Sequence, residues 1–139
     1  MSFLLDTNVV SEVQRARGAA QVKAWFAAVS SADLFLCVLT LGEIRQGTER
    51  LRRRDPRQAG VYEAWLGRLE AEFGDRILPV TAAVAHEWGR MNAGDPLPII
   101  DALLAATARV HGLTLVTRNT RDLARTGVAL LDPWLGATK

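Results

Sequence analysis

The chain has 139 residues, with 17 Lys or Arg against 15 Asp or Glu, so its formal net charge is only +2. This length fits one domain, residues 1–139, that can bury a self-sufficient hydrophobic core. The single cysteine, Cys37, lies in an apolar run, which excludes an intramolecular disulfide and favours a buried thiol in a reducing, cytoplasmic compartment. We expect neither a signal peptide nor a membrane span, because the N-terminus lacks a basic region and no segment approaches ~20 apolar residues.

Short apolar runs rich in β-formers alternate with longer stretches of helical period. This alternation indicates an α/β domain with a mainly parallel sheet. Five strands are predicted, over residues 3–5, 34–38, 77–80, 113–116 and 128–131.

Two amphipathic helices are predicted from apolar residues that recur about every four positions and precede a glycine. The first run is Val61, Trp65, Leu69 and Phe73 before Gly74, and the second is Val84, Trp88 and Met91 before Gly94. A third predicted helix, residues 102–110, is nearly uncharged and rich in alanine, so we expect it to be largely buried.

Several site classes lack support in the sequence. Neither His86 nor His111 has a second histidine or cysteine at ligand spacing, which argues against zinc. No P-loop and no G-x-G-x-x-G motif is present, so nothing supports a nucleotide cofactor. Arginines crowd residues 45–57 around Glu49 and Asp55, which suits either a polyanion or a solvated helix face.

The first two acids of interest each follow a predicted strand. Asp6 comes directly after residues 3–5, at the carboxyl end of the strand, where open α/β sheets bind ligands. Its alternative role is to cap the following helix. Glu43 ends the stretch Thr40-Leu41-Gly42-Glu43, which also fits a capping box, a purely structural arrangement.

The remaining candidates lie in the C-terminal third of the chain. Asp101 has apolar or small neighbours in the first turn of a predicted helix, where its charge is favourable but its burial requires a partner. Asn119 and Asp122 follow the fourth predicted strand, and an Asx turn or a helix cap would explain either one.

Each of these side chains has a structural explanation alone. They lie, however, at separate strand-to-helix junctions, and a parallel sheet brings those junctions to one edge. Several carboxylates in one cleft repel one another unless a divalent cation neutralises them. Oxygen ligands favour Mg²⁺ or Mn²⁺ over zinc, and such a metal can activate water for attack at phosphorus. The residues alone therefore predict a metal-dependent phosphodiesterase.

Five segments in order also resemble the PIN-domain ribonucleases, in particular the VapC-type, Fit-like toxins of toxin–antitoxin pairs. They are residues 4–12 around Asp6, 39–47 around Glu43, 97–108 around Asp101, 115–119 with Asp122, and the ending Leu131-Asp132-Pro133-Trp134. The chain departs from some relatives at Asn119, where they have a fourth acid. Either Asn119 or Asp122 could complete the site.

The resemblance implies a three-layer α/β/α sandwich, usually a homodimer, that cleaves RNA with Mg²⁺ or Mn²⁺ and is silenced by a cognate antitoxin. It also implies that Asp6, Asp101 and Glu43 bind the metal, with Glu43 alternatively orienting the attacking water. Asn119 and Asp122 would form the outer part of the catalytic site.

Two rival functions remain at this point. A metal-dependent phosphatase would also place an Asp after the first strand, but a haloacid-dehalogenase-type site would need a second Asp where this chain has Asn8. The other rival is a module that has lost catalysis and acts only by binding a protein, a reading that Asn119 keeps open.

Overall fold

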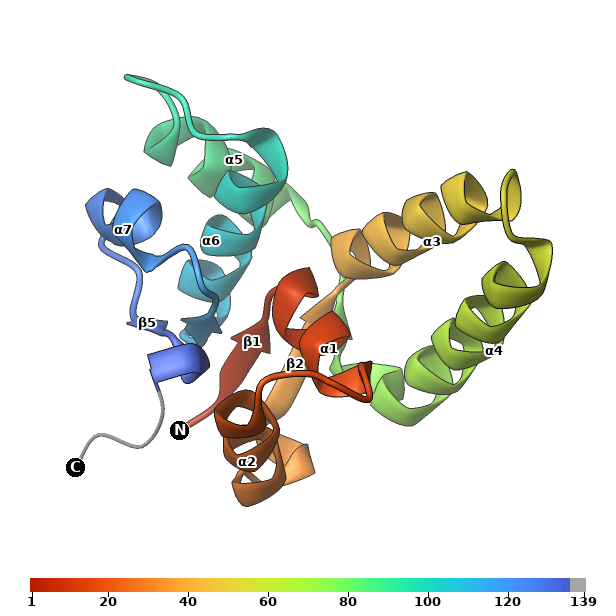
Figure 1. The fold of residues 1–139 in the computed structure, drawn as a ribbon. Coiled ribbons are helices and arrows are strands. Elements are labelled where there is room, and N and C mark those ends of the chain that lie inside the picture. The colour runs from red at the N-terminus through yellow and green to blue at the C-terminus, as the bar shows by residue number, and fades with distance from the viewer. Residues whose placement is uncertain (136–139) are drawn as a thin grey trace.

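The computed structural model describes residues 1–135, which form a five-stranded, wholly parallel sheet with helices on both faces (Figure 1). The strands are β1 (Phe3–Leu5), β2 (Leu34–Cys37), β3 (Ile77–Leu78), β4 (Thr114–Val116) and β5 (Leu130–Leu131). Their order across the sheet is β3-β2-β1-β4-β5. The predicted three-layer α/β/α sandwich is therefore confirmed.

Seven α-helices surround this sheet within the described residues. They are α1 (Thr7–Gln14), α2 (Ala20–Ala28), α3 (Val38–Arg52), α4 (Pro56–Phe73), α5 (Ala82–Met91), α6 (Ile99–His111) and α7 (Thr120–Leu123). None of the helices within residues 1–135 is long and apolar enough to cross a membrane.

Side chains of the central strand alternate between two hydrophobic cores, as the twofold period of a strand requires. Phe3 and Leu5 pack in one core with residues of α1 to α4, whereas Leu4 packs in the other with residues of α5, α6 and α7. Cys37 lies in the second core, where burial raises the pKa of its thiol. A thiol in this state is a poor nucleophile.

Four of the five predicted strands are one or two residues longer than the observed ones, and the first matches. The third shows the reason most clearly, because it ends at Leu78, directly before Pro79, which has no N–H to donate to a ladder.

The predicted helix ends are partly right. The helix α4 stops at Phe73 and Gly74 follows with φ of 48°, a conformation that favours glycine. The expected stop at Gly94 is wrong, because α5 ends at Met91. The side chain of Asn92 then accepts a hydrogen bond from the Leu97 amide (2.7 Å), so Gly94 lies inside the turn that follows the helix and not at the helix end.

The predicted buried helix is α6. Six of its residues are buried: Ala102, Leu104, Ala105, Ala106, Thr107 and Ala108. Since α6 leads directly into β4, its first turn lies at the end of the sheet where the parallel strands finish. This direction brings Asp101 to the same edge as the residues that follow β1 and β4.

Candidate active site

Asp6 is held by a threonine that directly follows the neighbouring strand β4, and not by its own helix. It is the N-cap residue of α1, yet its side chain makes no capping hydrogen bond. Instead the hydroxyl of Thr117, which follows β4, donates to Asp6 Oδ2 at 2.7 Å. Both side chains are buried. The capping role considered for Asp6 is therefore wrong.

Asn119 connects this pair to Asp101. Its backbone N–H donates to Thr117 Oγ1 (3.1 Å), and its side-chain Nδ2 donates to Asp101 Oδ2 (3.4 Å). Asn119 is the N-cap residue of α7, but its side chain does not cap that helix. A continuous hydrogen-bonded group thus joins Asp6, Thr117, Asn119 and Asp101, from three separate segments of the chain.

Glu43 lies in the second turn of α3, not at its start. That helix begins at Val38, with Cys37 as its N-cap residue, so the capping box at Thr40 and Glu43 does not exist. The Glu43 carboxylate accepts a hydrogen bond from Thr7 Oγ1, which lies 3.2 Å from the hydroxyl oxygen of Thr40. Because Thr7 follows Asp6 directly, Glu43 approaches the edge of the sheet from the α3 side.

Asp122 contributes charge without contact. It is exposed in α7 and makes no hydrogen bond within residues 1–135. The pKa of Asp101 is nevertheless raised, first by partial burial, then by the negative charges of Asp6 and, to a smaller extent, Asp122. The hydrogen bond from Asn119 opposes this rise. Three acids therefore share one electrostatic environment.

The donor set suits a hard cation, although the side chains are not closed around one. Within the described part of the chain, no three His, Cys, Asp or Glu side chains are close enough to hold an ion as they stand. Carboxylate and amide oxygens are the ligands that Mg²⁺ and Mn²⁺ prefer. A cation between Asp6 and Asp101 would also relieve the repulsion that raises the pKa of Asp101.

Two residues of the site were missed in the sequence, Thr7 and Thr117. Each is a hydroxyl next to a strand end, and each donates to one of the acids. The signal for Thr117 was present in its position directly after the apolar strand that ends at Val116. Nothing local to the sequence indicates that its partner is Asp6, 111 residues away.

The arginine-rich segment is partly neutralised. Arg45 and Arg52 form ion pairs with Glu49 and also with Glu63 of α4, which the sequence did not suggest as a partner. These pairs are exposed and contribute little stability, typically about 0–1 kcal/mol. Other arginines form no ion pair within residues 1–135, namely Arg50, Arg53, Arg54 and Arg57. They leave positive charge on the α3–α4 hairpin.

Comparison with known proteins identifies the family. A profile described as PIN domain matches residues 3–129, so the chain belongs to the PIN domain family. Toxin FitB of Neisseria gonorrhoeae is 32% identical over 95% of this chain and 98% of its own length. The VapC ribonuclease Y4jK of Sinorhizobium fredii is 29% identical over 95% of this chain and 97% of its own.

Solved structures agree with the fold. The crystal structure of FitAcB from Neisseria gonorrhoeae matches with a TM-score of 0.88 and 32% identity, covering 95% of this chain and 98% of the other. A toxin–antitoxin complex from Klebsiella pneumoniae matches with a TM-score of 0.70 and 25% identity, covering 95% of this chain and 98% of the other. The similarity thus extends over nearly the whole of these proteins.

The raised pKa of Asp101 predicts that this carboxylate lowers stability at neutral pH. In the unfolded chain Asp101 has the ordinary pKa near 3.8. Ionising Asp101 therefore lowers the stability of the folded state only above that pH. Asp101→Asn should therefore increase the free energy of unfolding at pH 7 in metal-free buffer, by on the order of 0.5 kcal/mol after solvent screening. The gain should vanish as the pH falls below about 3.8.

Urea unfolding at several pH values measures this difference. Asp75→Asn is the matched control, because Asp75 lies in the turn after α4, before β3 begins at the opposite edge of the sheet. A stability gain of Asp101→Asn that is equal at pH 3 and pH 7 would contradict the electrostatic explanation.

Proposed function

We propose that this chain is a metal-dependent endoribonuclease and the toxin of a toxin–antitoxin pair, built as one domain over residues 1–139. The observation that carries the proposal is that the site side chains form hydrogen bonds with other segments of the chain and cap no helix. Asp6, Glu43 and Asn119 could each cap a helix, and none does so; their side chains gather at the carboxyl edge of the sheet. The names of the relatives, toxin and VapC ribonuclease, support the same function.

Asp6 and Asp101 are the residues that would hold the cation, Mg²⁺ or Mn²⁺, with Glu43 as a further ligand. When bound, such an ion lowers the pKa of water and stabilises the charge that develops in attack at phosphorus. Thr117 holds the buried carboxylate of Asp6 in one orientation, and Asn119 does the same for Asp101. These hydrogen bonds pre-organise the two acids before substrate arrives.

Glu43 and Asp122 have different environments and therefore different roles. The Glu43 carboxylate is oriented by Thr7 and can accept a proton from an attacking water. Asp122 acts through its charge, since it is exposed and contacts none of the acids. Asn119, which contacts Asp101 directly, is the residue that completes the site.

The partners follow from the same proposal. The substrate is RNA, the regulator is a cognate antitoxin, and the active species is a homodimer in the cytoplasm. The toxin–antitoxin complex among the structural relatives supports the antitoxin.

RNA cleavage tests the proposed function. Purified protein, freed of any bound protein, should cleave structured RNA with Mn²⁺ or Mg²⁺ and leave a phosphomonoester intact. Products should carry 5′-phosphate and 3′-hydroxyl ends, since water attacks rather than a ribose hydroxyl. Asp101→Asn should lower the rate at least about 100-fold, whereas Asp75→Asn should not. Cleavage that persists in chelator, or cyclic phosphate ends, would contradict the proposal.

Thr117→Val tests the positioning of Asp6. Valine keeps the shape of threonine but removes the donor to a buried carboxylate, so cleavage should fall about 10- to 100-fold. Thr126→Val is a matched control, because buried Thr126 also makes two hydrogen bonds, to Leu123 O (2.7 Å) and from Val128 N (3.2 Å), away from the site. Each variant should lose about 1–3 kcal/mol of stability. Equal loss of activity in both variants would show that Thr117 is only structural.

A further inference from the structure

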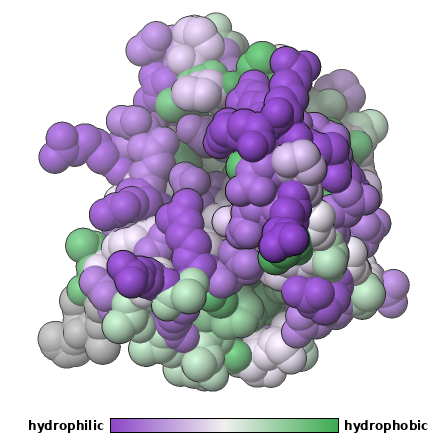
Figure 2. Space-filling view, turned by 45° about the vertical axis from the view of Figure 1, so that its right-hand side comes forward, coloured by the Kyte–Doolittle hydropathy of each residue, from purple (hydrophilic) through white to green (hydrophobic). Residues whose placement is uncertain are grey.

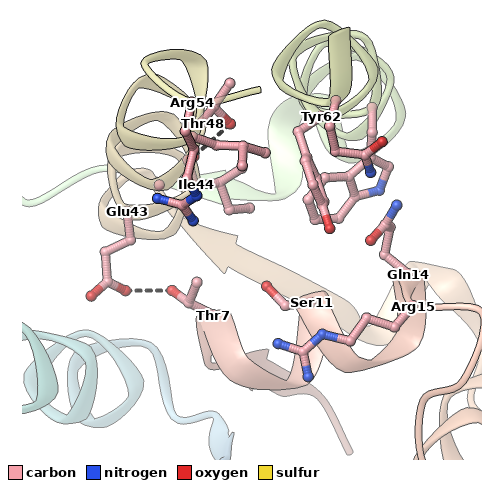
Figure 3. A pocket seen from close by; sticks show the side chains of 13 residues that line it. Thr7, Ser11, Gln14, Arg15, Glu43, Ile44, Thr48, Arg54 and Tyr62 are labelled. Atoms are coloured by element: carbon pink, nitrogen blue, oxygen red, sulfur yellow. Dashed lines mark hydrogen bonds between the residues drawn. The ribbon is translucent and has the colours of Figure 1, made fainter. Parts of the chain in front are cut away.

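A pocket between α1, α3 and α4 adjoins the acidic cluster and shares Glu43 with it. It encloses about 410 Å³, within the range of about 300–1,000 Å³ that small-ligand pockets occupy. Thr7 and Ser11 of α1 lie along one side, Ile44 and Thr48 of α3 along a second, and Tyr62 of α4 along a third (Figure 3). Because Thr7 and Glu43 belong to both regions, the pocket is continuous with the candidate active site.

Two aromatic rings form the α4 wall of this pocket. Tyr62 and Trp65 meet edge to face, with ring centroids 6.3 Å apart and planes at 71°. Trp65 is anchored by contact with the hydrophobic core, and both rings remain partly exposed. Anchored, partly exposed rings are the surfaces on which unpaired bases stack.

Polar groups without protein partners surround these rings. Among residues 1–135, no hydrogen bond forms from the side-chain polar groups of Ser11, Gln14, Gln58, Tyr62 and Trp65, all of which line the pocket. The amides of Gln14 and Gln58 each offer a donor and an acceptor, as the Watson–Crick edge of a base does. A surface that made only hydrophobic contacts would not need these unpartnered polar side chains.

Positive charge at the pocket comes from two arginines, and Glu43 supplies the one carboxylate among the lining residues. Arg15 and Arg54 both line it; Arg15 pairs with Glu12 at 3.0 Å, whereas Arg54 forms no ion pair within the described residues. Figure 2 shows that the side carrying the α3–α4 hairpin is covered mainly by hydrophilic side chains. A phosphodiester beside a stacked base would meet this charge.

We propose that this pocket binds one unpaired nucleotide of the RNA substrate next to the bond that is cleaved, and so determines sequence preference. The proposal rests on the ribonuclease function proposed above and adds a subsite to it. Tyr62 stacks on the base, Gln14 and Gln58 contact its edge, and Arg54 contacts a neighbouring phosphate. The occupant is a nucleotide because stacking rings, base-edge amides and an unpaired arginine converge on one pocket.

Binding without cleavage tests the subsite directly. The full chain is titrated, in EDTA, into fluorescein-labelled single-stranded hexaribonucleotides of A, C, G or U, and fluorescence anisotropy reports affinity. Wild type should prefer one base. Tyr62→Ala should weaken that complex at least about fivefold and level the four affinities. Gln58→Ala, at an exposed helix position that tolerates substitution, should weaken it about two- to tenfold.

Gln46→Ala is the matched control, because Gln46 is an exposed glutamine of the same hairpin that lies outside this pocket. It should bind like wild type. Equal affinity of wild type for all four oligonucleotides, no binding at all, or unchanged binding by Tyr62→Ala and Gln58→Ala would overturn the proposal. The last result is the one expected if the pocket instead holds a protein segment.

Cleavage mapping separates failure of the subsite from failure of the proposed function. With Mn²⁺, Tyr62→Ala should cut a structured RNA at changed positions relative to wild type. Unchanged positions would overturn the subsite and leave the ribonuclease intact. If wild type cleaves nothing, the ribonuclease proposal fails, and base-selective binding in EDTA still decides the subsite.

Discussion

The pairing of β1 with β4 is the constraint on which the site depends. Their register places Leu5 opposite Val116, and the Asp6 amide extends the ladder by donating to Val116 O at 3.0 Å. The next residues, Asp6 and Thr117, must therefore leave the sheet side by side. One ladder brings together two residues that are 111 positions apart and gives a buried carboxylate its donor.

The directions in which α6 and α3 run bring the other acids to the same edge of the sheet. Because α6 runs into β4, its first turn returns to the edge that β1 and β4 share, and Asp101 comes within reach of Asn119. The helix α3 starts from the next strand and carries Glu43 one turn further out, where Thr7 binds it. Holding Asp101 here has an energetic cost, because partial burial first, and then the negative charge of Asp6, raise its pKa. A bound cation would offset this cost.

The sequence predicts the parts of this structure that depend on local pattern. Apolar runs locate all five strands, and spacing with a terminal glycine locates the end of α4 at Gly74. Of the two alternatives that local pattern left open for Glu43, the capping box with Thr40 is wrong, since this stretch lies inside a helix that starts earlier. Local pattern also placed the end of α5 at Gly94, although the helix ends at Met91 and Gly94 lies inside the turn that Asn92 and Leu97 close.

The partners within the site could not be predicted, because they depend on long-range register. Thr117 and Thr7 both contact residues far away in the chain, and no local motif specifies those contacts. The sequence also could not separate Asn119 from Asp122; in the structure the amide of Asn119 contacts Asp101, whereas Asp122 is exposed.

The central claim is that Asp6 and Asp101 share one divalent cation at the carboxyl edge of the sheet. Anomalous diffraction from crystals grown with Mn²⁺ measures this directly, because the manganese signal locates the ion without reference to activity. The account predicts a peak within bonding distance of carboxylate oxygens of both Asp6 and Asp101. A peak elsewhere on the protein, or occupied sites that contact neither acid, would contradict it.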